Sequence, residues 1–236
     1  SRYFNREGRY GDGGAYRDPN SPYRSWYDFD PKYKGGYRSW WGFETLPEVN
    51  EENPSYVEFI TGEGGVIDTW LRRGAAGFRL DVADELPDDF IEKIRAAVKR
   101  VSPEKFLLGE VWEDATTKYG FGQRRTYLLG KGLDSVMNYP FKNAVLDFVK
   151  GKPAEQAMGE ILSICEHYPA PAMDTALNFL STHDTERALT VIADEPANGR
   201  GREWQSGRCV TGEAYEEGML RLRMAYAIIY TLPGVP

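Results

Sequence analysis

The sequence of 236 residues predicts an α/β fold built on a parallel β-sheet. From about residue 50 onward, short apolar runs typical of strands alternate with amphipathic segments typical of helices. Three of the apolar runs are followed by an acid, namely Asp81 in GFRLDVADE, Glu110 in FLLGEVW and Asp184 in FLSTHDTER. Active residues lie at the carboxyl ends of the strands in such folds, so these acids form the candidate site.

The first 45 residues differ from the rest of the chain in amino-acid composition. No Val, Ile, Leu or Met occurs before Leu46, and aromatic residues are dense between Gly, Pro, Asp and Asn. This composition predicts a loop-rich segment at residues 1–45, held together by its aromatic side chains. Three tryptophans, Trp26, Trp40 and Trp41, are candidates for a sugar platform, because flat aromatic faces suit pyranose rings.

The later elements follow in order. Asn53 and Pro54 predict the start of a helix that ends near Gly74. GFRLDV is the next predicted strand, and DDFIEKIRAAVKRV has the apolar spacing of a helix. The strands predicted after it are FLLGEVW, LDSVMNYPF and ALNFLSTHD, and the predicted helices are AVLDFVKG, EQAMGEILSICEHY, ERALTVIAD and EGMLRLRMAYAIIYTL.

The number of strands limits the architecture. Four predicted strands lie between Gly77 and His183, and Val235-Pro236 is positioned to open a fifth. A closed (β/α) barrel needs eight strands and about 250 residues. We therefore expect the chain to form the middle and later part of such a barrel.

The overall composition argues against several classes of protein and kinds of site. The net charge of −7 and the lack of a basic stripe argue against nucleic-acid binding. No apolar run approaches membrane-spanning length, and no signal peptide is expected at the start of the chain. Cys165 is expected in the core and Cys209 in a polar stretch, so a disulfide framework is not expected. Only two histidines are present, which excludes a His-rich zinc site.

Arg79 and Asp81 should share one face of their strand, because side chains alternate. A guanidinium beside a carboxylate favours its ionised form, and a nucleophile at an anomeric carbon must be ionised. A purely structural ion pair explains the same pattern.

Glu110 ends an apolar strand with no cation near it in sequence. A carboxyl group in apolar surroundings keeps its proton to higher pH, as a general acid requires, and Trp112 is placed to cover it. The alternative is a solvent-exposed strand terminus.

His183 and Asp184 are neighbours at the end of a predicted strand. Their side chains should diverge, so we expect both to touch one ligand rather than each other. The alternative is that Asp184 caps the following helix.

Together, the three segments resemble those of the α-amylase superfamily (glycoside hydrolase family 13). The resemblance implies that Asp81 is the nucleophile with Arg79 beside it, that Glu110 is the acid/base, and that Asp184 stabilises the transition state with His183 binding sugar. LPEVNEENP at residues 46–54 resembles the MPKLN-type segment of the cyclomaltodextrinase, neopullulanase and maltogenic amylase subgroup. Glu85, which ends VADE, resembles the last residue of that subgroup's VANE and implies an acceptor-side role, although Asp84 replaces the usual Asn.

The resemblance implies a (β/α)8 TIM barrel, here a partial barrel of about strands 4 to 8. Residues 1–45 would be part of the family's inserted B region, and residues 46–236 the partial catalytic barrel. The family's earlier strands and the end of its eighth strand would lie outside this sequence. We therefore expect this length of chain to be weakly active or inactive by itself.

The expected function is retaining hydrolysis of α-1,4-linked glucans such as maltooligosaccharides, cyclodextrins or starch fragments. Two alternatives are an α-1,6-glucosidase or transglycosylase of the same superfamily, and a catalytically incompetent glycan-binding fragment. No cofactor is required and no metal ligand is identified, but family members often carry a structural calcium. The subgroup implies a cytoplasmic location, with an extracellular one as the alternative, and a homodimer for the full-length protein. Neither a nucleic acid nor a membrane is an expected partner.

Overall fold

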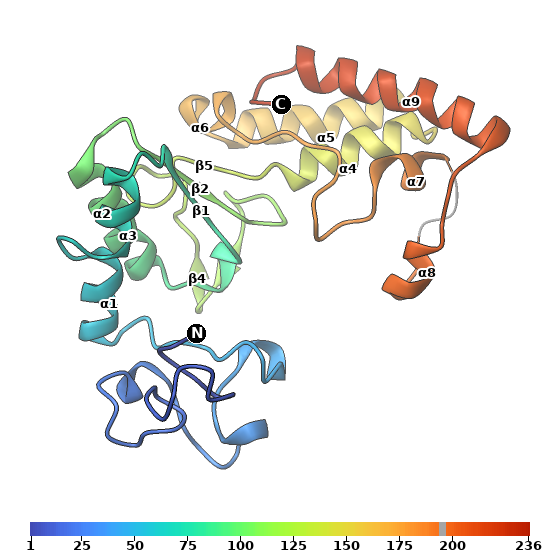
Figure 1. Ribbon diagram of the computed structural model, residues 1–236. Helices are drawn as coiled ribbons and strands as arrows, with labels where there is room; N and C mark the ends of the chain where they lie inside the picture. Colours follow the sequence, from blue (N-terminus) through green and yellow to red (C-terminus); the bar gives the residue numbers. More distant parts are fainter. Residues whose placement is uncertain (194–196) are drawn as a thin grey trace. The chain divides into compact units, whose positions relative to one another are not determined.

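A computed structural model describes residues 1–193 and 197–236 (Figure 1). The chain divides into two units, which are considered separately. The first comprises residues 1–76 and 89–105, and the second comprises residues 77–88 and 106–236.

The first unit begins with the loop-rich segment that the composition predicted. Its short 3-10 turns are η1 (Arg24–Trp26), η2 (Lys34–Gly36) and η3 (Trp40–Gly42). Phe4 and Tyr37 are buried at its centre, with their ring centroids 4.7 Å apart. Trp26 is also buried and donates from its ring nitrogen to the Ser55 hydroxyl at 2.8 Å, so its proposed role as a sugar platform is wrong.

Two helices, α1 (Pro54–Thr61) and α2 (Val66–Arg72), replace the single helix expected from Asn53 to Gly74. Asn53 caps α1 as predicted, because its side chain accepts from the backbone N–H groups of Ser55 and Tyr56. The break falls in the Gly-rich sequence at residues 62–65, where glycine loses the most entropy on entering a helix. The last helix of this unit is α3 (Asp88–Val101), as predicted, and its buried face consists of Phe90, Ile91, Ile94, Ala97 and Val98.

The second unit holds a parallel sheet, which confirms the predicted fold class. In the described residues the strand order is β1 (Gly77–Leu80), β2 (Phe106–Gly109), β5 (Ser135–Val136). Single parallel bridges then join Met137 to Leu177 and Leu177 to Val235. Five chain segments therefore lie side by side in sequence order, as expected for consecutive strands of a partial barrel.

The strand predicted at ALNFLSTHD is reduced to the bridge at Leu177, and LDSVMNYPF forms only the short β5. The helix after β5 begins earlier than predicted, since α4 spans Tyr139–Val149 with Asn138 as its cap and Pro140 in its first turn.

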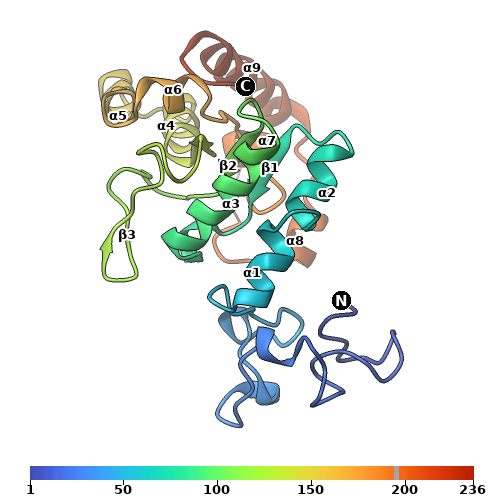
Figure 2. The ribbon, with the colours of Figure 1, turned by 90° about the vertical axis from the view of Figure 1, so that its left-hand side faces the viewer.

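Helices α5 (Ala154–His167) and α9 (Gly212–Thr231) match the predicted segments, and they run beside α4 in Figures 1 and 2. α7 (Ala188–Ala193) lies within the predicted helix ERALTVIAD, whose last residue, Asp194, lies outside the described residues. The core between these helices includes Phe141, Val145, Ile161, Leu180, Ile192 and Ile229. Cys165 packs against this core, while Cys209 is exposed and both thiols are free.

Four elements were not predicted from the sequence. They are α6 (Ala170–Asp174), α8 (Arg202–Ser206), and the antiparallel hairpin of β3 (Tyr119–Gly120) and β4 (Gln123–Arg124). α6 lies beside β5, where the Ser135 hydroxyl donates to the carbonyl of Ala172 at 2.6 Å. These elements are too short for periodicity to reveal them.

Candidate active site

The ends of β1 and β2 place two of the three acids in one neighbourhood. Hydrogen bonding between these strands continues past their ends, because the Glu110 N–H donates to the Leu80 carbonyl at 2.9 Å. The Ala83 N–H then donates to the Glu110 carbonyl at 3.1 Å. Gly109 allows close packing here, since a Cβ at this position would lie 2.2 Å from a methyl group of Leu133. Asp81 and Glu110 thus follow adjacent parallel strands at the carboxyl edge of the sheet.

A single guanidinium contacts both of these acids. Arg79 is hydrogen-bonded to the Asp81 carboxylate through Nη1, as its position on the strand predicted. Its Nη2 lies 3.1 Å from Oε1 of Glu110, within ion-pair distance but without the alignment of a hydrogen bond. Its Nε faces the sulfur of Met137 at 3.4 Å. Arg79 therefore bridges the carboxylates of Asp81 and Glu110, and the sequence did not predict the contact with Glu110.

The side chain of Glu110 is buried, with 3% of the residue exposed. The alternative of a solvent-exposed strand terminus is therefore excluded, and the expected apolar surroundings are wrong too, because polar groups contact the carboxylate. Oε2 accepts from the Val82 N–H at 2.9 Å, and Oε1 accepts from the Trp112 ring nitrogen at 3.1 Å and the Tyr139 hydroxyl at 3.2 Å. These donors fix the carboxyl group in one orientation.

Val82 adopts a left-handed backbone conformation, with φ of 47°. This region is costly for a β-branched residue and is uncommon outside special sites. The conformation ends β1 and turns the Val82 N–H toward Glu110. The bend also leaves the Asp81 side chain 70% exposed, open to an incoming ligand.

Tyr139 and Trp112 form an aromatic wall beside Glu110. Their rings are stacked with centroids 4.3 Å apart and an interplanar angle of 16°, and Trp112 remains 44% exposed. Burial raises the pKa of Tyr139 to about 12, against the opposing effect of a hydrogen bond with Thr182. The phenol is therefore a protonated donor at ordinary pH. Sequence reasoning missed Tyr139 because it placed this residue inside the predicted strand LDSVMNYPF, whereas β5 ends at Val136 and Tyr139 is the first residue of α4.

His183 and Asp184 contact each other, contrary to the prediction that they diverge. Nε2 of His183 lies 3.0 Å from a carboxylate oxygen of Asp184. The reason is that residues 178–187 form a loop rather than a strand, so alternation does not apply. Asp184 does not cap the next helix either, because α7 begins four residues later at Ala188.

The Asp184 segment joins the site through hydrogen bonds. The Asp184 N–H donates to the hydroxyl of Thr182 at 3.2 Å, and that hydroxyl also bonds to Tyr139. Tyr139 in turn donates to Glu110. This series connects the Asp184 loop to Glu110, and Glu110 in turn accepts from the N–H of Val82, next to Asp81.

A pair of buried amides supports these loops. Asn138 is fully buried and donates to the Asn178 side chain at 3.0 Å. Asn178 donates to the Pro233 carbonyl at 2.9 Å, and its N–H donates to the Val235 carbonyl at 2.7 Å. The amides thereby hold three neighbouring segments of the sheet edge in register.

Glu85 lies in the 3-10 turn η4 (Ala83–Glu85), directly after the bend at Val82, and is exposed. The rest of this loop is held by two cations from the hairpin region. Lys118 lies 3.2 Å from the Asp84 carboxylate. Arg125 is buried, pairs with Asp88 at 2.8 Å and donates to the carbonyls of Asp84 and Leu86.

No group of three or more His, Cys, Asp or Glu side chains in the described residues could hold a metal ion. The structural calcium implied by the resemblance stays a prediction.

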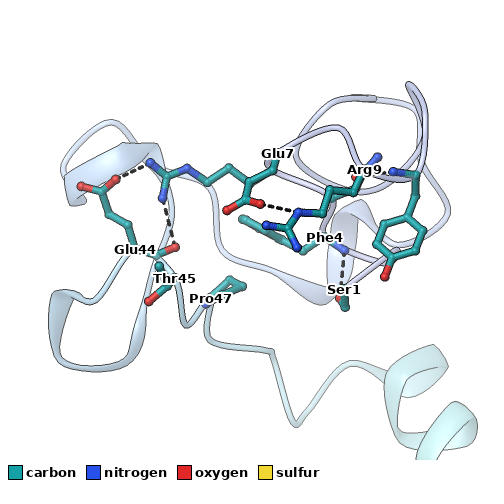
Figure 3. A pocket seen from close by; sticks show the side chains of 10 residues that line it. Ser1, Phe4, Glu7, Arg9, Glu44, Thr45 and Pro47 are labelled. Carbon is teal, nitrogen blue, oxygen red and sulfur yellow. Dashed lines mark hydrogen bonds and ion pairs between the residues drawn. The ribbon is translucent and has the colours of Figure 1, made fainter.

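In the first unit, a hollow of about 250 Å³ is lined by the exposed ion pairs Arg6–Glu44 and Arg9–Glu7 (Figure 3). It contains none of the predicted site residues. Among residues 1–193 and 197–236, no helix is both long and apolar enough to cross a membrane.

Residues 3–206 match the family model of the alpha amylase catalytic domain. Among curated proteins, the chain is 34% identical over its whole length to an amylopullulanase of Thermoanaerobacter thermohydrosulfuricus, of which it covers 17%. It is 32% identical over 79% of its length to neopullulanase 2 of Thermoactinomyces vulgaris, of which it covers 32%. The chain therefore spans between a sixth and a third of the length of these relatives.

Comparison with solved structures also finds carbohydrate hydrolases, and the chain again covers only part of each. The type III pullulan hydrolase from Thermococcus kodakarensis superposes with a TM-score of 0.75 and 27% identity, over 94% of this chain and 36% of that one. The cyclic α-maltosyl-(1→6)-maltose hydrolase from Arthrobacter globiformis gives a TM-score of 0.73 and 25% identity, over 94% and 44% of the two chains.

Proposed function

Because the chain belongs to the alpha-amylase catalytic-domain family, we propose that it carries the catalytic residues of a retaining glycosidase acting on α-1,4-linked glucans. One observation carries the proposal: a single guanidinium, that of Arg79, contacts the carboxylates of both Asp81 and Glu110. Retaining glycosidases need two carboxyl groups about 5–5.5 Å apart, and inverting enzymes keep them further apart. Two carboxylates that share the two terminal nitrogens of one guanidinium favour the shorter spacing.

In the proposed mechanism, Asp81 attacks the anomeric carbon while Glu110 protonates the leaving glycosidic oxygen. Glu110 then removes a proton from water, and this water releases the sugar from Asp81. The exposed face of Asp81 suits the attack, and the fixed orientation of Glu110 suits proton transfer. Arg79 stabilises the ionised nucleophile.

Asp184 and His183 have a supporting role in the proposal. Asp184 accepts from sugar hydroxyls and stabilises the positive charge that develops on the ring. The 3.0 Å contact with His183 orders both side chains on an otherwise exposed loop. Glu85 contacts the acceptor side of the substrate, and Trp112 covers the site beside Glu110.

The test is covalent trapping with a 2-fluorinated maltosyl fluoride, followed by peptide mass spectrometry. The expected label is on Asp81, and Asp81→Asn abolishes it. Because this chain is shorter than its relatives and we expect it to turn over weakly alone, trapping is more sensitive than steady-state assays. A label on any other residue contradicts the proposed nucleophile, and the absence of a label together with the absence of turnover of nitrophenyl maltoside supports a glycan-binding fragment.

A second candidate is cleavage or transfer at α-1,6 linkages. It is favoured by the similarity to a protein described as an amylopullulanase and to one described as a hydrolase of cyclic α-maltosyl-(1→6)-maltose. The same three acids serve either linkage. Product analysis with maltotriose, cyclodextrin, pullulan and isomaltose distinguishes the two candidates, and a transglycosylase gives products longer than the substrate. A homodimer and a cytoplasmic location remain predictions.

A further inference from the structure

The β3–β4 hairpin presents two large aromatic side chains to solvent. Tyr119 is 72% exposed and Phe121 is 62% exposed. Figure 2 shows the hairpin extending from the rest of the second unit. Neither side chain belongs to the core or to the site described above.

The turn of the hairpin holds Phe121 in a backbone conformation that is unfavourable for a bulky residue. Phe121 and Gly122 both have positive φ, 52° and 77°, as a two-residue type I′ turn requires. Asn-Gly is the preferred pair in such turns, and a bulky residue in this conformation is an outlier. Since Phe121 is mostly exposed, burial does not offset this cost, which points to a function for the ring.

The hairpin is anchored to the loop that follows the proposed nucleophile. Arg125, next to β4, is only 2% exposed and pairs with Asp88, which ends that loop. Its guanidinium also lies 5.1 Å from the centre of the Phe121 ring, which restrains the ring at the exposed tip. On the other strand, Lys118 precedes Tyr119 and contacts Asp84.

These contacts place the hairpin close to the candidate site. Asp84 is three residues from Asp81, so their Cα atoms are at most about 11 Å apart. An aromatic surface anchored to the loop that follows Asp81 suits the apolar face of a sugar ring beyond the bond being cleaved. Lys118 forms ion pairs with the carboxylates of both Asp84 and Glu113, so its one positive charge offsets part of the negative charge beside the hairpin.

We propose that Tyr119 and Phe121 form a binding subsite for a distal glucose unit of an α-glucan, so that the chain favours longer oligosaccharides. The inference rests on the proposed function for its choice of ligand and deepens it by naming the length of the substrate. The subsite contributes to binding and takes no part in bond cleavage.

The test measures dissociation constants of the 236-residue chain for maltoheptaose and maltose by isothermal titration calorimetry. The variant is Tyr119→Thr with Phe121→Asn, since Thr suits a strand and Asn suits the turn, so the hairpin should be kept. The matched control is Tyr230→Thr, which removes an aromatic side chain that is 70% exposed on α9. We expect the double variant to bind maltoheptaose about five- to tenfold more weakly, with maltose affinity and the control unchanged. Phe121→Trp should retain the affinity for maltoheptaose.

Unchanged affinity of the double variant for maltoheptaose overturns the subsite, as does a wild-type chain that binds no maltoheptaose. An altered oligomeric state in light scattering, with unchanged affinity, identifies the hairpin as a contact between copies of the chain instead. Because binding is measured without turnover, a chain that binds as expected but is neither labelled nor active refutes the proposed hydrolysis and leaves the subsite standing.

Discussion

Arg79 is the residue on which the geometry of the candidate site depends most. It hydrogen-bonds Asp81 and lies 3.1 Å from Glu110, whose carboxyl group is buried. A buried carboxylate is costly unless it is paired, so the cation contributes to stability as well as to function. The planar fork of an arginine can contact two carboxylates at once, which an ammonium group does less well.

We therefore predict that Arg79→Lys lowers kcat about 100-fold, because one of the two carboxylates loses its fixed position. Arg79→Ala should in addition lower the free energy of unfolding by about 1–3 kcal/mol. Steady-state kinetics and urea unfolding measure the two effects. Arg9→Ala, which breaks an exposed ion pair with Glu7, is the control and should change neither. Full activity of Arg79→Lys would show that the bridge is dispensable.

A substitution at Tyr139 can remove a single hydrogen bond from the same site. Tyr139→Phe removes the hydroxyl that donates to Glu110 and keeps the ring that stacks on Trp112. We expect kcat to fall about five- to tenfold and the free energy of unfolding to fall by about 1 kcal/mol, since three other groups still contact Glu110. Tyr226→Phe, on the exposed side of α9, is the matched control. A variant that keeps wild-type kcat would mean that the hydroxyl is only structural.

At the scale of elements, the hairpin region is the main departure from the predicted pattern. Residues 113–127 have neither helical nor strand periodicity, yet they supply Lys118 and Arg125, which hold the loop with Glu85. Lys118 and Arg125 lie 34 and 37 residues beyond Asp84 and Asp88 in sequence, so no local pattern could reveal these pairs. Long regular helices such as α3 and α5 were predicted well because their apolar spacing repeats over several turns.

We predict that Arg125→Met destabilises the loop of residues 83–88. The methionine keeps the packing volume but removes the donors to the Asp84 and Leu86 carbonyls and leaves Asp88 without its cation. The free energy of unfolding should fall by roughly 2–4 kcal/mol, and amide hydrogen exchange should accelerate at residues 83–88. The neighbouring Arg124→Met is the control, because the Arg124 side chain is exposed and donates to the carbonyl of Thr116 in its own hairpin region. Equal exchange in the two variants would contradict the role of Arg125.

At the scale of the whole molecule, several buried or half-buried phenols make stability sensitive to high pH. Burial raises the pKa values of Tyr56, Tyr139 and Tyr168 to about 12 each, and it raises that of Tyr127 further. In the unfolded chain these groups titrate near pH 10. Above that pH the unfolded state loses protons that the folded state retains, so the stability present below pH 10 is lost as the pH rises toward 12.

We therefore predict that the urea midpoint is lower at pH 11.5 than at pH 9, with little change between pH 7 and pH 9 from these groups. Tyr168→Phe should reduce the slope between pH 9 and 11.5, although it also removes the acceptor for the Ala115 N–H. Tyr10→Phe, at a position that is 60% exposed, should leave the slope unchanged. A midpoint that does not depend on pH in this range would exclude the linkage.

The sequence by itself determined the α/β class, the order of the long helices and the identity of the acids, because periodicity and residue type are local properties. It also determined the ion pair of Arg79 with Asp81, since residues two apart on a strand share a face. Only the tertiary structure decided that Arg79 also contacts Glu110, and that Tyr139 and Val82 donate hydrogen bonds to the Glu110 carboxylate. It also decided that His183 contacts Asp184. These contacts depend on how separate strand ends bend and meet. That depends on packing between residues far apart in the chain, which no local pattern records.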